Sequence, residues 1–238
     1  MIKSLKYLLG FFSDVLQMIT SYLPGPIGYI LRYRYWKRRL RHLGHDVKID
    51  VGVYFQNPRF ISVDDYCWID RGVMILAGPD KSSRPRRLIS NNTFPLEKGM
   101  VYIGKRVHVA PYSILSGIGG LYISDDCGIA SGARIYSFSN HYRSDEYPSD
   151  RKYCFALFVE PLRQYMIEGP IYLGENVGIA SNVTILPGVS IERYSFVAVN
   201  SVVTKSFAEN SFISGNPSKR IKERFEPKQS ANNTNSHE

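Results

Sequence analysis

Apolar residues recur at every sixth position from residue 49 onward, and this repeat constrains the fold more than any other feature of the chain. A period of six belongs neither to an isolated helix nor to a simple strand, and it predicts a solenoid. The longest run is uninterrupted, and each of the other two contains one slip of two residues. The seventeen anchor positions are Leu173, Ile179, Ile185, Ile191, Val197 and Val203; Ile103, Val109, Leu115, Ile123, Ile129 and Ile135; and Ile49, Phe55, Val63, Ile69 and Ile75.

Each six-residue unit predicts one short strand followed by a turn, with the anchor side chain directed into the solenoid. Three units would close one triangular coil, and the coils would stack at the strand spacing of about 4.8 Å. We therefore expect an all-β solenoid over residues 45–208, interrupted by polar, proline-containing loops at 78–100 and 137–170. Residues 209–226 would close the solenoid, and the polar tail at 227–238 is expected to be disordered.

Residues 1–44 precede the repeat and are expected to be helical and basic. Between residues 2 and 23, apolar residues fall at alternating spacings of three and four, which predicts an amphipathic helix. After a Pro-Gly-Pro break, basic and aromatic residues are interleaved over 32–41, which is compatible with a second helix. The apolar face of the first helix must lie on the body of the protein, on a sister subunit or on a membrane surface, and the sequence leaves these three open.

The charge balance predicts an anionic partner, because 30 Lys and Arg against 21 Asp and Glu give a net charge of +9. A membrane surface contacted through residues 1–41 is favoured over nucleic acid, since the helix with an apolar face fits lipid and no nucleic-acid-binding motif is present. We expect no membrane-spanning helix, because polar residues and prolines break the longest charge-free stretch. Three scattered cysteines and no recognisable signal peptide predict a cytoplasmic protein, peripheral at the inner face of the cell membrane.

The most specific motifs lie in residues 174–224, which read GENVGIASNVTILPGVSIERYSFVAVNSVVTKSFAENSFISGNPSKRIKER. The hexad run, followed by SVVTK and then by SGNP with basic residues, resembles the terminal coils of the hexapeptide-repeat acyltransferases, which are left-handed parallel β-helices. Within that family the likeness is greatest to the O-acetyltransferases of bacterial surface polysaccharides. The resemblance covers roughly residues 45 to 225. It implies a homotrimer with an active site in each cleft between neighbouring subunits, acetyl-CoA as co-substrate, and no metal.

The resemblance also implies where acetyl-CoA would lie. Three groups of residues are involved: backbone neighbours of the pantetheine arm, a Thr-Lys pair near the nucleotide end, and cations of the closing segment that would meet the phosphates. They are Ala180, Ser181, Ala198 and Val199; Thr204 and Lys205; and Lys219, Arg220 and Lys222.

Transfer of an acetyl group from a thioester to a hydroxyl requires a base, and histidine suits that role near neutral pH. Of the five histidines, His42 and His45 precede the repeat, His237 is in the tail, and His108 lies on an ordinary coil. His141 alone stands where a regular coil breaks into a long loop, and the resemblance places the catalytic base there.

A base works better when an acceptor holds its far ring nitrogen, and the 137–170 loop offers three carboxylates for this purpose. Asp145, Glu146 and Glu168 remain equal candidates. Tyr142 and Arg143, next to the proposed base, are expected to cover the acceptor sugar.

Two positions depart from the pattern of the sugar acetyltransferases, which commonly carry Trp where this chain has Gly178 and often carry Asn where it has Ala110. Both changes leave the acceptor open, and the smaller residue at 178 leaves room for a bulkier substrate. We expect O-acetylation of a surface glycan, namely a capsule, O-antigen or exopolysaccharide precursor that is lipid-linked or polymeric. N-acetylation of an amino sugar and a non-catalytic β-solenoid scaffold are the alternatives. A zinc-dependent carbonic anhydrase would need three histidines, and the solenoid offers only His108 and His141.

Overall fold

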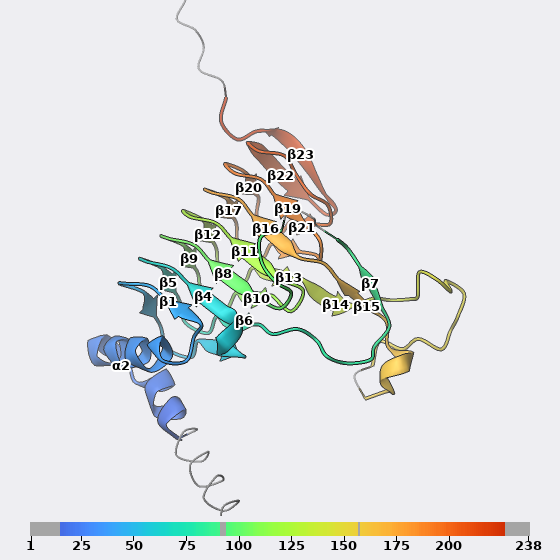
Figure 1. Ribbon diagram of the computed structural model, residues 1–238. Coiled ribbons are helices and arrows are strands. Elements are labelled where there is room, and N and C mark those ends of the chain that lie inside the picture. Colours follow the sequence, from blue (N-terminus) through green and yellow to red (C-terminus); the bar gives the residue numbers. More distant parts are fainter. Residues whose placement is uncertain (1–14, 91–93, 157, 227–238) are drawn as a thin grey trace, which may run out of the picture.

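The computed structural model describes residues 15–90, 94–156 and 158–226, which wind into a left-handed parallel β-helix (Figure 1). Three sheets form the sides of the column, and we call them face 1, face 2 and face 3 in the order in which the chain visits them. Face 1 contains β1 (His42–Leu43), β4 (Ile61–Val63), β8 (Val101–Ile103), β11 (Leu121–Ile123), β16 (Ile171–Leu173) and β19 (Ser190–Ile191).

Faces 2 and 3 are built in the same way. Face 2 contains β2 (Lys48–Ile49), β5 (Trp68–Ile69), β9 (His108–Val109), β12 (Gly128–Ile129), β17 (Gly178–Ile179) and β20 (Phe196–Val197), followed by β22 (Ser211–Gly215) and β23 (Ser218–Glu223). Face 3 contains β3 (Tyr54–Gln56), β6 (Met74–Leu76), β10 (Ile114–Ser116), β13 (Arg134–Tyr136), β18 (Thr184–Ile185) and β21 (Val202–Val203). The six strands of faces 1 and 3 give six coils, and the antiparallel hairpin β22–β23 closes the far end.

The column of anchor side chains forms the core, as the six-residue period predicts. All seventeen anchors are buried, and the most exposed of them, Phe55, shows only 4% of its surface. Each pairs in register with the anchor of the next coil, as Ile135 does with Ile185. Burial of a Val, Leu or Ile side chain contributes about 1.5–3 kcal/mol, so the stacked anchors are the main source of stability.

The turns from face 1 to face 2 share one unusual backbone conformation. In every coil one residue of this turn has a positive φ, between 52° and 61°, which favours Asn, Asp or Gly. The residues are Asp46, Tyr66, Arg106, Asp126, Asn176, Tyr194 and Asn210. Three of them are bulkier than this conformation prefers, so the stacked coils must hold the turns in place.

All interruptions of the repeat occur at one edge, where face 3 turns into face 1. The first slip is a short 3-10 helix, η1 (Pro58–Phe60), and the second is the glycine-rich turn at 117–120. Both long loops, 78–100 and 137–170, also leave the column at this edge (Figure 1). Insertions here leave the inward anchors undisturbed, because the other two turns of each coil keep their length.

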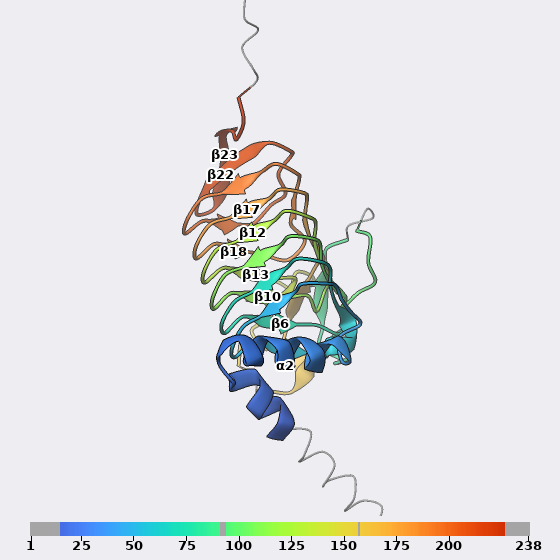
Figure 2. The ribbon, with the colours of Figure 1, turned by 90° about the vertical axis from the view of Figure 1, so that its left-hand side faces the viewer.

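Helices cover the N-terminal end of the column (Figure 2). Residues 15–22 are helical, and α2 (Gly25–Lys37) begins within the Pro-Gly-Pro sequence and lies across the first coil. The predicted helix over 2–23 is therefore described only from residue 15, and its first part lies outside the described residues, as does the tail at 227–238. Strand β1 already belongs to the first coil, so the solenoid begins at His42. Within the described ranges, no helix combines the length and the apolar character needed to cross a bilayer.

Candidate active site

A small sheet outside the column carries His141. Strands β14 (Phe138–Asn140) and β15 (Met166–Glu168) pair antiparallel at the base of the 137–170 loop, and β7 (Arg86–Leu88) from the other long loop pairs parallel with β15. His141 follows β14 directly, and its backbone N–H donates to the Tyr165 carbonyl at 2.7 Å. The position of the histidine is thus set by a sheet that joins both loops.

The half-buried imidazole of His141 has a backbone partner. Its Nδ1 lies 2.7 Å from the carbonyl oxygen of Arg143. A carbonyl can only accept a hydrogen bond, so Nδ1 must carry the hydrogen and, in the neutral ring, Nε2 carries the lone pair. The rings of Tyr142, at 4.6 Å, and Tyr165, at 5.9 Å, flank the imidazole. The geometry leaves Nε2 as the atom that can accept a proton.

The three carboxylates of the loop have other partners. Asp145 pairs with Arg87 at 3.4 Å. Glu146 accepts a hydrogen bond from the Tyr147 hydroxyl and raises the pKa of that phenol. Glu168 is 4% exposed and receives Arg86 at 2.8 Å and Lys98 at 2.7 Å. Among the residues described, none of the three carboxylates is hydrogen-bonded to His141, whose partner is instead a carbonyl that residue types alone do not reveal.

A charged cluster beneath the sheet ties the two loops together. Arg86 bridges Asp80, at 3.0 Å, and Glu168, and Arg84 also binds Asp80 at 3.0 Å. Both guanidinium groups lie over the ring of Phe138, at 5.4 and 5.8 Å from its centre. These side chains are largely shielded from water, so the ion pairs fix the loops relative to each other rather than merely decorating a surface.

The residues implied for the pantetheine arm lie at one edge of the column. Ala180 and Ser181 follow β17, and Ala198 and Val199 follow β20 in the next coil, where face 2 turns into face 3. The N–H groups of Ala180 and Ala198 donate to the carbonyls of the following coil at 3.0 and 2.8 Å. They are therefore committed to coil stacking, and a ligand would have to use other backbone groups of this edge.

The cations implied for the nucleotide end are exposed, in two places. Thr204 and Lys205 follow β21 at the edge of the long loops, two coils beyond the start of the 137–170 loop, or about 10 Å along the column. Lys219, Arg220 and Lys222 lie on β23 at the closing end, where Arg220 is 3.5 Å from Glu223. All of these cations can reach solvent.

The chain does not bring all of these residues together. His141, Tyr142 and Arg143 belong to the edge where face 3 ends, whereas Ala180 and Ser181 belong to the edge where face 3 begins. The whole width of face 3 separates the two groups within one protomer. They can share one site only if the second group comes from another copy of the chain.

A groove on face 2, not predicted from the sequence, lies beside the pantetheine edge. Two outward positions in neighbouring coils are glycines, Gly128 and Gly178, which leaves a hollow of about 510 Å³. Phe196 leans over Gly178, and His108, bonded to Asp70 at 2.8 Å, stands at the other end. The wall of the groove also includes Ala110, Ala180, Ser181 and Val199. A glycine immediately before each of the anchors Ile129 and Ile179 was the available signal.

Known proteins resemble the chain in sequence. A "Probable macrolide acetyltransferase" of Lysinibacillus sphaericus is 38% identical over 109 residues, which are 44% of this chain and 61% of that protein. The "Putative lipopolysaccharide biosynthesis O-acetyl transferase WbbJ" of Escherichia coli K12 is 30% identical over 52% of this chain and 61% of its own length. A "dTDP-4-amino-4,6-dideoxy-D-glucose acyltransferase" of Escherichia coli is 32% identical over 55% and 65%. The chain thus spans about three fifths of the length of these curated relatives, and no protein-family model matches it.

Solved structures share the fold over most of the chain. AntD, an N-acyltransferase from Bacillus cereus in complex with dTDP and coenzyme A, has a TM-score of 0.64 and 22% identity, covering 79% of this chain and 87% of AntD. The hexapeptide-repeat acetyltransferase VCA0836 from Vibrio cholerae, in complex with acetyl coenzyme A, has a TM-score of 0.54 and 19% identity, covering 90% and 86%. With the six-residue period, the triangular coils and the sequence relatives, these likenesses identify the chain as a member of the hexapeptide-repeat acyltransferase family.

Proposed function

We propose that the protein is an acetyl-CoA-dependent O-acetyltransferase that acts on a sugar hydroxyl of a bacterial surface glycan, a capsule, O-antigen or exopolysaccharide precursor. The observation that carries the proposal is the 2.7 Å contact between Nδ1 of His141 and the Arg143 carbonyl. It fixes the tautomer in which Nε2 is a base, on the loop where the family resemblance expects one.

The chemistry asked of this chain is modest. Nε2 of His141 would take the hydroxyl proton as the acceptor oxygen attacks the thioester carbonyl. When the carbon–sulfur bond breaks, the imidazolium can return that proton to the departing thiolate, so that the ester, free coenzyme A and neutral His141 remain. Tyr142 and Arg143, both exposed beside the imidazole, are proposed to hold the sugar.

A homotrimer follows from the separation of the two groups of site residues. In the proposed assembly, His141 of one protomer faces the Ala180 and Ser181 edge of a neighbour, and acetyl-CoA lies in the cleft between them. Lys205, Lys219, Arg220 and Lys222 would meet its phosphates. In the described ranges no cluster of three or more His, Cys, Asp or Glu side chains is arranged to hold a metal ion, and the proposed reaction uses none.

N-acetylation of an amino sugar is the second candidate. It is supported by the similarity to the dTDP-4-amino-4,6-dideoxy-D-glucose acyltransferase of Escherichia coli. The groove opened by Gly178 has room for either acceptor, so geometry does not separate the two.

The nature of the product decides between the candidates. The experiment offers the protein acetyl-CoA with a panel of hydroxyl sugars and oligosaccharides and, separately, 4-amino-4,6-dideoxy sugar nucleotides, and follows release of the thiol. An O-acetyl ester is cleaved by mild alkali or hydroxylamine, whereas an amide survives. An alkali-labile product supports the proposal, an alkali-stable product moves the assignment to N-acetylation, and failure to bind acetyl-CoA favours the scaffold alternative.

We also propose that the protein is cytoplasmic and peripheral at the inner face of the cell membrane, through the part of the chain before the solenoid. Its positive charge supports this location, because the cytoplasmic leaflet is anionic.

A further inference from the structure

The outward side of α2 is apolar at one end and basic at the other. Ile27 is 67% exposed, Ile30 52% and Leu31 36%. Arg34 and Arg38 continue the same stripe one and two turns later and are also exposed. The spacing of these five residues places them on one side of the helix, and we call them the basal surface.

The basal surface belongs to a helix that is firmly attached to the column. On its inner side Arg32 is buried, and its Nε donates to the Ile49 carbonyl of the first coil at 2.7 Å. Its Nη1 donates to the Leu23 carbonyl at 2.6 Å, which ties in the preceding helical segment. Trp36 packs against Phe55 of the core, with ring centres 4.7 Å apart. The exposed stripe is therefore a preformed platform at the end of the solenoid (Figure 2).

The charge around the basal surface has a single sign. Between residues 15 and 45 the sequence contains no Asp or Glu and six Lys or Arg. Arg34 and Arg38 form no ion pair with any residue in the described parts of the chain. The helical residues 15–22 add further exposed apolar side chains, among them Leu16 at 50% and Ile19 at 52%. Apolar side chains next to unpaired cations fit an anionic bilayer surface better than they fit water.

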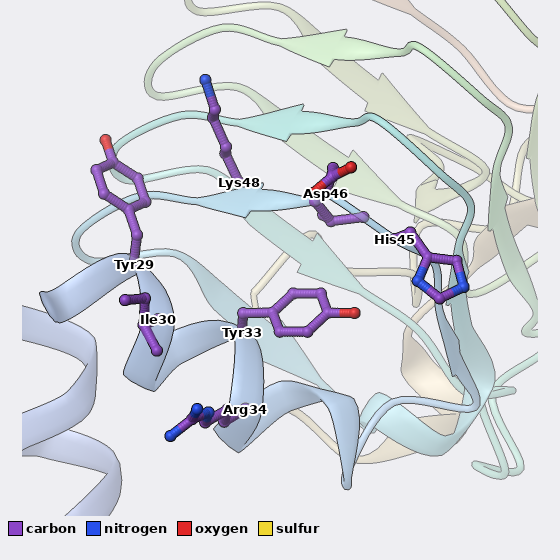
Figure 3. Close-up of a pocket in the computed structure, with 8 residues that line it drawn as sticks. Tyr29, Ile30, Tyr33, Arg34, His45, Asp46 and Lys48 are labelled. Carbon is purple, nitrogen blue, oxygen red and sulfur yellow. The ribbon is translucent and has the colours of Figure 1, made fainter. Parts of the chain in front are cut away.

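The neighbouring groove between α2 and the first coil is not a phosphate pocket (Figure 3). The Tyr33 hydroxyl donates to the Gly44 carbonyl at 2.8 Å, and Lys48 points away from α2, over the ring of Trp68 at 4.6 Å. Asp46 adds a negative charge to the lining, whereas Arg34 points away from the coil. The cations of this region are thus directed outward, which favours a general response to surface charge over recognition of one headgroup.

We propose that the basal surface docks on an anionic phospholipid bilayer, with Ile27, Ile30 and Leu31 at the boundary between headgroups and acyl chains and with Arg34 and Arg38 among the headgroups. This inference rests on the peripheral location proposed above and adds the lipid class and the contact residues. A cleft that runs along two neighbouring solenoids requires nearly parallel axes, so threefold symmetry would place three basal surfaces on one side. Three weak contacts would then act together.

The test measures binding of the full chain to vesicles of phosphatidylcholine alone and to vesicles that also contain phosphatidylglycerol. Each cation near an anionic surface strengthens binding about fivefold, so the variant Arg34→Gln/Arg38→Gln should bind the mixed vesicles about 25-fold more weakly. The control variant Arg71→Gln/Arg151→Gln removes the same charge from exposed positions of the body and should bind like wild type. Replacing phosphatidylglycerol by phosphatidylserine at equal charge should change little.

A second variant tests the apolar contact. Ile27→Ser/Leu31→Ser should weaken binding about tenfold without lowering the melting temperature, because both side chains are exposed. Equal binding to neutral and charged vesicles, or unchanged binding of the two basal variants, would overturn the inference. So would vesicle binding that appears only after residues 1–14 are removed, or retention on duplex DNA but not on vesicles. Acetyl transfer to a water-soluble acceptor, measured on the same preparations, reports the proposed activity independently.

Discussion

Replacement of Glu168 by glutamine tests whether the ion-pair cluster positions the hairpin that carries His141. Glu168 is 4% exposed and accepts from Arg86 at 2.8 Å and from Lys98 at 2.7 Å. It closes the strand pair with Phe138, and three residues before it Tyr165 accepts the backbone hydrogen bond of His141. The amide keeps the shape of the side chain and removes its charge.

The expected loss follows from the two contacts. A hydrogen bond to a charged group contributes about 1.5–3 kcal/mol and a neutral one about 0.5–1.5 kcal/mol, so a loss of about 1 kcal/mol at each contact lowers the free energy of unfolding by about 2 kcal/mol. Arg86 is not left unpaired, because it keeps Asp80 at 3.0 Å. For a chain of this size, the melting temperature should fall by about 4–8 °C.

Thermal unfolding followed by circular dichroism measures this shift. The matched control is Glu160→Gln, because Glu160 is 73% exposed and lies 3.6 Å from Arg163, and its melting temperature should stay within about 1 °C of wild type. A melting temperature of Glu168→Gln that is also within about 1 °C would refute the reasoning. We further expect kcat to fall without displacement of the acid limb of the pH–rate profile. A displaced limb would mean that Glu168 interacts with the imidazole after all.

Two further predictions concern the core and the face 2 groove. Burial raises the pKa of Cys67 to about 11 and of Cys127 to about 12, so a thiol reagent at pH 8 should label only Cys154 in the native protein and all three cysteines in denaturant; rapid native labelling of a second thiol would contradict this. A methyl group at Gly178 would lie 2.7 Å from the aromatic ring above it, whereas one at Gly128 meets nothing within 4 Å. Thermal unfolding should therefore show Gly178→Ala destabilised by about 1 kcal/mol or more and Gly128→Ala unchanged or more stable, and the reverse order would be inconsistent with the groove as described.

The column was predictable because its cause is written in the sequence at a fixed period. Each anchor, such as Ile135 or Ile185, faces inward for the same local reason, and register follows from equal spacing. The slip after Leu115 is visible in the sequence, but the edge at which the extra residues leave the column is not. The direction of α2 was also hidden, since it depends on the buried Arg32 reaching carbonyls in two other segments.

The site was predictable only where one residue type carries the argument. His141 stands out by its place at the end of a coil, yet its partner is the Arg143 carbonyl, and backbone groups leave no signature in residue types. Glu168 was a reasonable candidate for the partner, but β7 brings Arg86 to it from a segment 82 residues away. Contacts of this kind depend on how two loops meet, which no local pattern encodes.

Acetyl transfer by the variant His141→Ala tests the central claim most directly, measured as thiol release from acetyl-CoA in the presence of the best acceptor. His42→Ala, at an exposed histidine of the first coil, is the matched control, and His108→Ala tests the other histidine of the solenoid. The account predicts that turnover falls by about 10² or more in His141→Ala, that acetyl-CoA still binds, and that the other two variants keep turnover within about tenfold of wild type. Turnover of His141→Ala close to that of wild type would contradict the assignment of Nε2 of His141 as the base.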